Sequence, residues 1–90
     1  AGVIALTKGW AMAWGRQNVR VNCVAPGLID TEANAGVDPA FIGRLRQDTA
    51  LGRIGEPAEV ADVTAFLLSE ASSFVSGQTV VACGGRVMVP

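Results

Sequence analysis

Hydrophobic positions along the chain fall into three helix-type and two strand-type runs. Residues 1–17 contain no proline and are rich in helix-forming residues, which predicts a helix that Gly15 helps to end. The hydrophobic positions of this helix lie all round it rather than on one stripe. A helix of that kind is buried on every side, so we expect one face to pack on a sheet and the other on a partner subunit.

The two strand-type runs lie far apart in the sequence. Residues 19–25 are rich in β-branched side chains and lead into Pro26-Gly27, which predicts a strand that ends in a loop. Residues 78–82 form a second short β run, closed by a pair of glycines. Such a long excursion between two strands is typical of a crossover between parallel strands, and two strands alone make no stable sheet.

Two further helices are predicted between the strands by their starting signals. Asp38 suits an N-cap and Pro39 the first helical position, which predicts a helix over residues 40–49. A third helix is expected to begin at Glu56-Pro57, because Glu59 then falls at the third helical position and can reach back to the first free amides. The sequence therefore predicts an α/β fold.

Composition excludes several classes of function. Lysine and arginine number 7 against 8 acidic residues, with no histidine and a net charge of −1, so the basic surface that nucleic acids require is missing. The longest uncharged run, residues 71–85, is interrupted by serines, a glycine and a glutamine and cannot cross a membrane. Hydrophobic residues make up 50% of so short a chain, which predicts that some apolar surface lies against neighbours.

Two cysteines, Cys23 and Cys83, lie in apolar runs without the spacing of a metal site. We expect reduced thiols in the core, which favours a reducing compartment and a cytoplasmic location. The alternative is a redox-active or disulfide-bonded pair, which requires the two sulfurs to approach bonding distance.

Candidate chemistry is sparse when the residues are considered alone. The carboxylates of Asp30, Glu32 and Asp38 include an acid/base pair or, alternatively, serve as capping and solvated side chains. Pro26-Gly27 is a ligand site or simply a strand-ending turn. Ligands of open α/β sheets bind beyond the carboxyl ends of the strands, which is where this pair falls.

The segment Arg20-Val21-Asn22-Cys23-Val24-Ala25-Pro26-Gly27-Leu28-Ile29-Asp30-Thr31 resembles the N-x-V-x-P-G-x-I-x-T segment of the short-chain dehydrogenase/reductase family. The resemblance continues in order through residues 51–61, 66–69 and 76–78 and the final glycine pair. It implies that residues 1–90 are the C-terminal fragment of a single NAD(P)-binding Rossmann-type domain, with two strands and about three helices of a doubly wound parallel sheet.

The resemblance also implies a function, the transfer of a hydride between NAD or NADP and a carbonyl or alcohol substrate. It assigns the nicotinamide site to four positions, which are Pro26, Gly27, Ile29 and Thr31. Residues 32–50 resemble the family's substrate-binding loop, with Pro39, Phe41, Ile42 and Leu45 as candidate contacts. Their apolar character suggests an apolar or acyl-type substrate, although simple helix packing explains each of them equally well.

The chain departs from the family pattern in two respects. The family's Tyr-x-x-x-Lys pair would end just before Ala1, so we expect an interior cut, no catalytic side chain in this chain and no activity of the 90 residues alone. Cys83 stands where the family usually has aspartate before the glycine pair. Asn22 is expected to tie its strand to a neighbouring loop. The resemblance also implies a homodimer or homotetramer, and the alternative function is a truncated, non-catalytic module that acts through oligomerisation.

Overall fold

A two-stranded parallel sheet pairs two segments that lie far apart in the sequence in the computed structural model, which describes residues 1–30 and 36–86. Strand β1 (Cys23–Pro26) pairs with β2 (Thr79–Ala82), with Cys23 opposite Thr79 and Pro26 opposite Ala82. The predicted crossover between parallel strands is confirmed.

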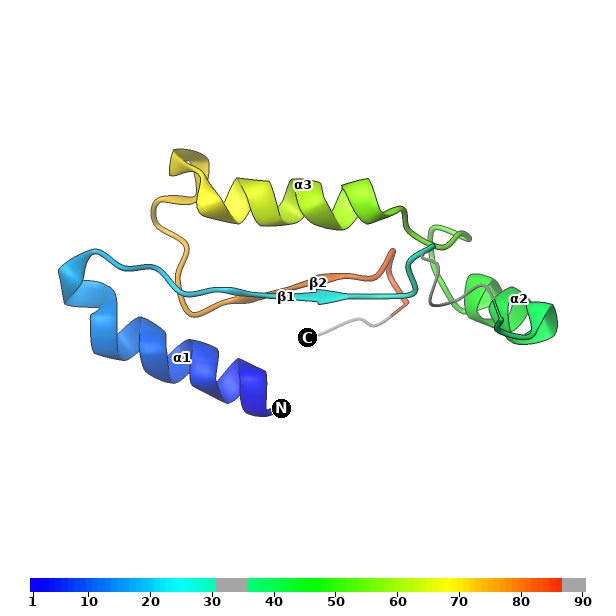
Figure 1. The fold of residues 1–90 in the computed structure, drawn as a ribbon, viewed down its shortest axis with the longest axis horizontal. Helices are drawn as coiled ribbons and strands as arrows, with labels where there is room; N and C mark the ends of the chain where they lie inside the picture. Colours follow the sequence, from blue (N-terminus) through cyan, green and yellow to red (C-terminus); the bar gives the residue numbers. More distant parts are fainter. Residues whose placement is uncertain (31–35, 87–90) are drawn as a thin grey trace.

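Helices cover both faces of this sheet. The described residues form α1 (Gly2–Trp14), which continues into the 3-10 turn η1 (Gly15–Gln17), α2 (Pro39–Gln47), and α3 (Pro57–Leu68), which is followed by the 3-10 turn η3 (Glu70–Ser72). Figure 1 shows α1 and α3 on opposite faces of the sheet, with α2 beyond the carboxyl ends of the strands. This arrangement of helix, sheet and helix confirms the predicted α/β architecture.

Both predicted helix starts are confirmed by their capping contacts. Asp38 is the N-cap of α2, where its Oδ1 accepts a hydrogen bond from the Ala40 N–H at 2.9 Å. At the start of α3, Glu56 and Glu59 form a reciprocal capping box, in which Glu59 Oε1 accepts from the Glu56 N–H at 2.9 Å. These contacts satisfy amides that a helix otherwise leaves without partners.

Strand β1 is shorter than the predicted strand over residues 19–25. The residues before it are bonded partly by side chains, while the Gly77 N–H still donates to the Val21 carbonyl at 2.7 Å. The Val21 N–H donates to Ser76 Oγ at 3.2 Å. Asn22 bridges the loop before β2, donating through Nδ2 to the Val75 carbonyl at 2.9 Å and accepting through Oδ1 from the Gln78 N–H at 3.1 Å. The prediction of a strand start at residue 19 was wrong, and the predicted tie through Asn22 is confirmed.

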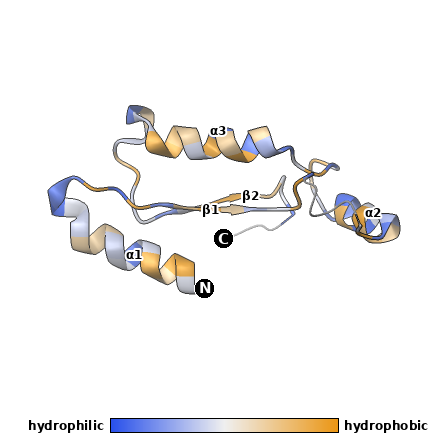
Figure 2. Cartoon of the chain, in the orientation of Figure 1, coloured by the Kyte–Doolittle hydropathy of each residue, from blue (hydrophilic) through white to orange (hydrophobic). Residues whose placement is uncertain are grey.

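Most hydrophobic side chains remain exposed. Leu67, 7% exposed, is the single buried large hydrophobic residue of the described part. The accessible surface of 6515 Å² exceeds the roughly 5,000 Å² of a compact monomer with the same 9.3 kDa mass. Figure 2 shows hydrophobic residues along α3 and the N-terminal half of α1. The fold therefore presents apolar faces that need further cover, as the composition predicted.

Helix α1 illustrates this exposure. Its single buried side chain is Thr7, whose Oγ1 donates to the Val3 carbonyl at 2.7 Å. Trp10 and Trp14 stack on each other with ring centroids 5.6 Å apart and stay partly exposed. The second covered face that we expected for this helix is not provided by residues 1–30 and 36–86. No helix within those ranges combines the length and the hydropathy needed to span a bilayer.

Candidate functional site

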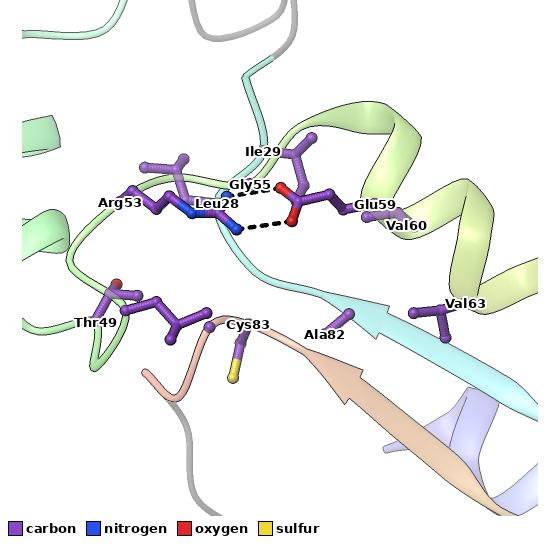
Figure 3. A pocket seen from close by; sticks show the side chains of 12 residues that line it. Leu28, Ile29, Thr49, Arg53, Gly55, Glu59, Val60, Val63, Ala82 and Cys83 are labelled. Atoms are coloured by element: carbon purple, nitrogen blue, oxygen red, sulfur yellow. Dashed lines mark hydrogen bonds and ion pairs between the residues drawn. The ribbon is translucent and has the colours of Figure 1, made fainter.

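A cavity of about 250 Å³ lies at the carboxyl ends of the two strands. Three parts of the chain enclose it: the strand ends, the turn between α2 and α3, and the first half of α3 (Figure 3). Most of the lining is apolar and includes Leu28, Ile29, Leu51, Val60 and Val63. Arg53 and Glu59 add opposite charges.

The turn between α2 and α3 is bonded to both strand ends. The Gly55 N–H donates to the Leu28 carbonyl at 2.9 Å, and the Asp30 N–H donates to the Gly55 carbonyl at 2.8 Å. On the other strand, the Leu51 N–H donates to the Gly84 carbonyl at 2.9 Å. The backbone that follows β1 is thus held in place by a segment more than twenty residues away in the sequence.

The glycine pair after β2 permits this close approach. Gly84 and Gly85 have φ angles of 65° and 86°, in the left-handed region that other L-residues rarely adopt. A Cβ atom on Gly85 would lie 2.6 Å from the Cβ of Ala50, and one on Gly84 would lie 3.0 Å from Thr49 Cγ2. Any larger residue would push the turn away from the strand.

Arg53 and Glu59 form a two-pronged ion pair at one wall of the cavity (Figure 3). Arg53 donates to the two carboxylate oxygens at 2.7 and 2.8 Å. Hydrogen bonding from Arg53, and next from the Glu56 N–H, lowers the pKa of Glu59 from 4.5 to about 2. The same hydrogen bond raises the pKa of Arg53 further above its ordinary value. The pair is therefore fully charged at neutral pH.

The predicted nicotinamide residues fall at the end of β1, but not all of them reach the cavity. Pro26 is the last residue of the strand and is exposed, and Gly27 donates its N–H to the Ala82 carbonyl at 2.8 Å. A Cβ on Gly27 would lie 2.8 Å from Cys83 Cα, so glycine is needed here for strand contact. Ile29 lines the cavity. Thr31, like Glu32, lies outside the described residues.

The predicted substrate contacts on α2 are placed apart from the cavity. Phe41 is exposed, and the Arg44 guanidinium lies 5.8 Å from the centre of its ring. Ile42 and Leu45 are half-buried, and neither they nor Phe41 line the cavity. The described structure therefore does not bring the α2 candidates together with Ile29.

Other residues have structural positions. Asp38 caps α2, as the capping interpretation of this residue predicted. Cys23 and Cys83 are both half-buried. Cys83 lies four residues beyond Thr79, the partner of Cys23, which separates the two by roughly 13 Å at about 3.3 Å per residue. That is well beyond the 7 Å or so that a disulfide allows between Cα atoms, so the alternative of a redox pair was wrong.

Sequence reasoning missed the roles of Arg20 and Arg53. Arg20 donates to carbonyls near the end of α3, and Arg53 pairs with Glu59. Only the second left a local signal, because Arg53 lies six positions before the capping glutamate and just ahead of the helix start.

Comparison with known proteins places this fold in a family. The family model described as enoyl-(acyl carrier protein) reductase matches residues 1–86. The chain belongs to the short-chain dehydrogenase/reductase family. The predicted resemblance and the Rossmann-like fold are confirmed.

Relatives of this short-chain dehydrogenase/reductase chain include the 3-oxoacyl-[acyl-carrier-protein] reductase of Thermotoga maritima, 43% identical over 88 residues, which are 98% of this chain and 36% of that protein. A 3-oxoacyl-[acyl-carrier protein] reductase structure from Brucella melitensis matches with a TM-score of 0.94 and 45% identity, over 98% of this chain and 33% of that one. A further Brucella melitensis reductase structure, with bound NAD, matches with a TM-score of 0.89 and 42% identity, over 98% and 31% of the two chains. The chain thus spans about a third of the length of the relatives it matches.

Proposed function

We propose that this chain is the C-terminal part of an NAD(P)-dependent oxidoreductase that transfers a hydride between nicotinamide and a carbonyl or alcohol carbon. The observation that carries the proposal is the similarity of nearly the whole chain to reductases, one of them with bound NAD. The position of Pro26, Gly27 and Ile29 supports it, because open α/β sheets bind their ligands at the carboxyl ends of the strands.

The cavity fits part of a cofactor site. Its volume of about 250 Å³ lies below the roughly 300–1,000 Å³ of a complete small-molecule site, so this chain would supply one wall. In our proposal Pro26, Gly27 and the Ile29 backbone line the nicotinamide, and Thr31 binds the carboxamide or pyrophosphate. The cofactor supplies or accepts the hydride, while these residues orient the nicotinamide and keep water from it.

Residues 32–50 are the proposed substrate segment. Phe41 is exposed on α2, which lies beyond the strand ends where a substrate would approach (Figure 1). With Ile42 and Leu45 it would offer apolar contacts, which favour an apolar or acyl-type carbonyl or alcohol substrate. The chain contributes no catalytic side chain in this proposal, so the 90 residues alone are inactive.

Residues 1–90 would then belong to a single Rossmann-type domain that works in a cytoplasmic homodimer or homotetramer. The exposed apolar side chains of α1, among them Met12, Trp10 and Trp14, support such an assembly, because monomeric proteins rarely expose large apolar patches.

The test is activity of the full-length protein that contains this chain. Oxidation of NADH and NADPH would be followed with carbonyl substrates of increasing apolar chain length. Phe41→Ala should raise the KM for apolar substrates more than for small polar ones, whereas Phe74→Ala, a fully exposed phenylalanine at the other end of the sheet, should change neither. A full-length protein without nicotinamide binding or turnover would contradict the proposal, and equal effects of Phe41→Ala on both substrate types would contradict the role of α2.

A further inference from the structure

The turn of residues 48–56 determines where the backbone after β1 lies. We name it the junction turn. Two of its hydrogen bonds flank Ile29, because Gly55 accepts from the Asp30 N–H and donates to the Leu28 carbonyl. A shift of Gly55 therefore moves the backbone on both sides of Ile29.

Side-chain packing contributes little to the middle of the junction turn. Leu51, Gly52 and Arg53 are exposed, and Gly52 has a φ angle of 72°. A Cβ on Gly52 would meet nothing within 4 Å. Polar contacts therefore hold this part of the turn, and one of them is the hydrogen bond from the Leu51 N–H to the Gly84 carbonyl.

Arg53 adds side-chain contacts to these backbone bonds. Its guanidinium binds the Glu59 carboxylate through two parallel hydrogen bonds and also donates to the Ile54 carbonyl at 3.3 Å. This is the one ion pair in residues 1–30 and 36–86. A two-pronged pair fixes direction as well as distance, so it orients the turn relative to α3.

Glu59 is a firm anchor for this pair. It lies in the first turn of α3, and its Oε1 is also held by the Glu56 N–H. The carboxylate is thus bound by the Arg53 side chain and by the Glu56 backbone at the same time. Arg53 therefore connects the junction turn to α3.

The pair is too exposed to matter much for folding. The side chains of Arg53 and Glu59 are 51% and 48% exposed, and ion pairs at such positions add little to global stability. A weak contact of this kind can nonetheless select one arrangement of a loosely packed turn. Its loss should therefore alter the site more than the fold.

We propose that Arg53 is a positioning residue of the nicotinamide site: paired with Glu59, it holds the junction turn and, through Gly55, the Leu28–Asp30 backbone around Ile29. The inference rests on the proposed function for its link to the cofactor. It does not place Arg53 in contact with the cofactor or the substrate.

The experiment compares Arg53→Gln, Glu59→Gln and the double variant in the full-length protein. Glutamine at position 59 can still close the capping box, so Glu59→Gln removes the ion pair and keeps the helix start. Arg16→Gln is the matched control, because Arg16 is an exposed arginine of η1 at the other end of the sheet. Each variant is assayed for cofactor KM, for kcat, for Tm and for amide hydrogen exchange.

We expect Arg53→Gln to raise the cofactor KM by about two- to fivefold with kcat changed less than about twofold, the range that loss of an exposed ion pair allows. Exchange of the Gly55 and Asp30 amides should accelerate by a similar factor, while the Gly27 amide, bonded to Ala82, should not change. Glu59→Gln should reproduce both effects, and the double variant should add nothing, because the two side chains act as one unit. Arg53→Lys should restore part of the affinity.

Three results would overturn the proposal. An unchanged KM for Arg53→Gln, or unchanged exchange at Gly55 and Asp30, would show that the pair does not position the site. A raised KM for Arg53→Gln with a normal Glu59→Gln would mean that Arg53 touches the ligand itself. Equal acceleration at Gly27, together with a large fall in Tm, would indicate a general structural role. A wild-type protein that binds no nicotinamide would instead overturn the proposed function, while the exchange rates would still decide whether Arg53 holds the turn.

Discussion

Replacing Arg20 by methionine should destabilise the protein strongly, although none of the acidic side chains in residues 1–30 and 36–86 forms an ion pair with this arginine. Arg20 lies just before β1, and its guanidinium donates to the carbonyl and to Oγ of Ser72, both at 2.9 Å. Longer bonds reach the carbonyls of Ser69 at 3.2 Å and Val75 at 3.3 Å. Ser72 is only 1% exposed, so water cannot easily replace the lost donor.

The expected loss follows from the two short bonds. A hydrogen bond from a charged donor contributes about 1.5–3 kcal/mol, and the two longer bonds add little, so we expect the free energy of unfolding to fall by about 3 kcal/mol. For a domain of roughly 150–250 residues, each kcal/mol shifts Tm by about 2–4 °C. The Tm of Arg20→Met should therefore drop by about 6–12 °C.

The assay is urea and thermal unfolding of the full-length protein at one fixed concentration, because assembly makes stability depend on concentration. Arg16→Met is the control, since Arg16 is exposed and makes no side-chain hydrogen bond with the described residues. Arg20→Lys should lose about half as much, because one ammonium group cannot reach carbonyls on both sides of the fork. Equal stabilities for Arg20→Met and Arg16→Met would refute the reasoning.

Three further predictions concern single positions. Gly27→Ala should lower the free energy of unfolding by about 1–3 kcal/mol, because the new Cβ would lie 2.8 Å from Cys83 Cα. Gly43→Ala is the control and should be neutral or stabilising, because a Cβ at Gly43 meets nothing within 4 Å. A lower Tm for Gly43→Ala than for Gly27→Ala would contradict this. Acid titration of stability should show a small loss between about pH 4.5 and pH 2, because the unfolded Glu59 carboxyl binds a proton first while the folded one has a pKa of about 2. The loss should be small because the pair is exposed; Glu59→Gln should flatten that part of the curve, and an unchanged curve would argue against the ion pair. Mild oxidation should leave Cys23 and Cys83 unbridged within one chain, and a peptide map that finds them linked would disprove their separation.

Much of the local structure could be predicted from the sequence. Helix starts at Pro39 and Pro57 follow from residues within four positions of each other: an N-cap aspartate before Pro39, and a glutamate at the third position after Glu56. The ending of β1 at Pro26-Gly27 is equally local, because proline and glycine interrupt a strand through their own backbone. The resemblance to a known family added the expectation that the residues at the end of β1 line a cofactor site.

Other features depended on residues that are far apart in the chain. Arg20 meets Ser72, and Asn22 meets Val75, across more than fifty residues. The regular pairing of β1 begins only at Cys23, and before it side-chain contacts supply part of the bonding to the loop that precedes β2. No pattern within residues 19–25 could reveal them.

The sequence by itself therefore determined the types of element, the starts of α2 and α3 and the family pattern, because each depends on neighbouring residues. Only the tertiary structure decided the strand register, the separation of the two cysteines and the attachment of the junction turn to both strands. The register sets which residues of β1 and β2 lie opposite each other. The two strands are joined by a long crossover, so no local pattern fixes this register. The register also depends on the packing of α1 and α3 on opposite faces of the sheet, which local propensities do not encode.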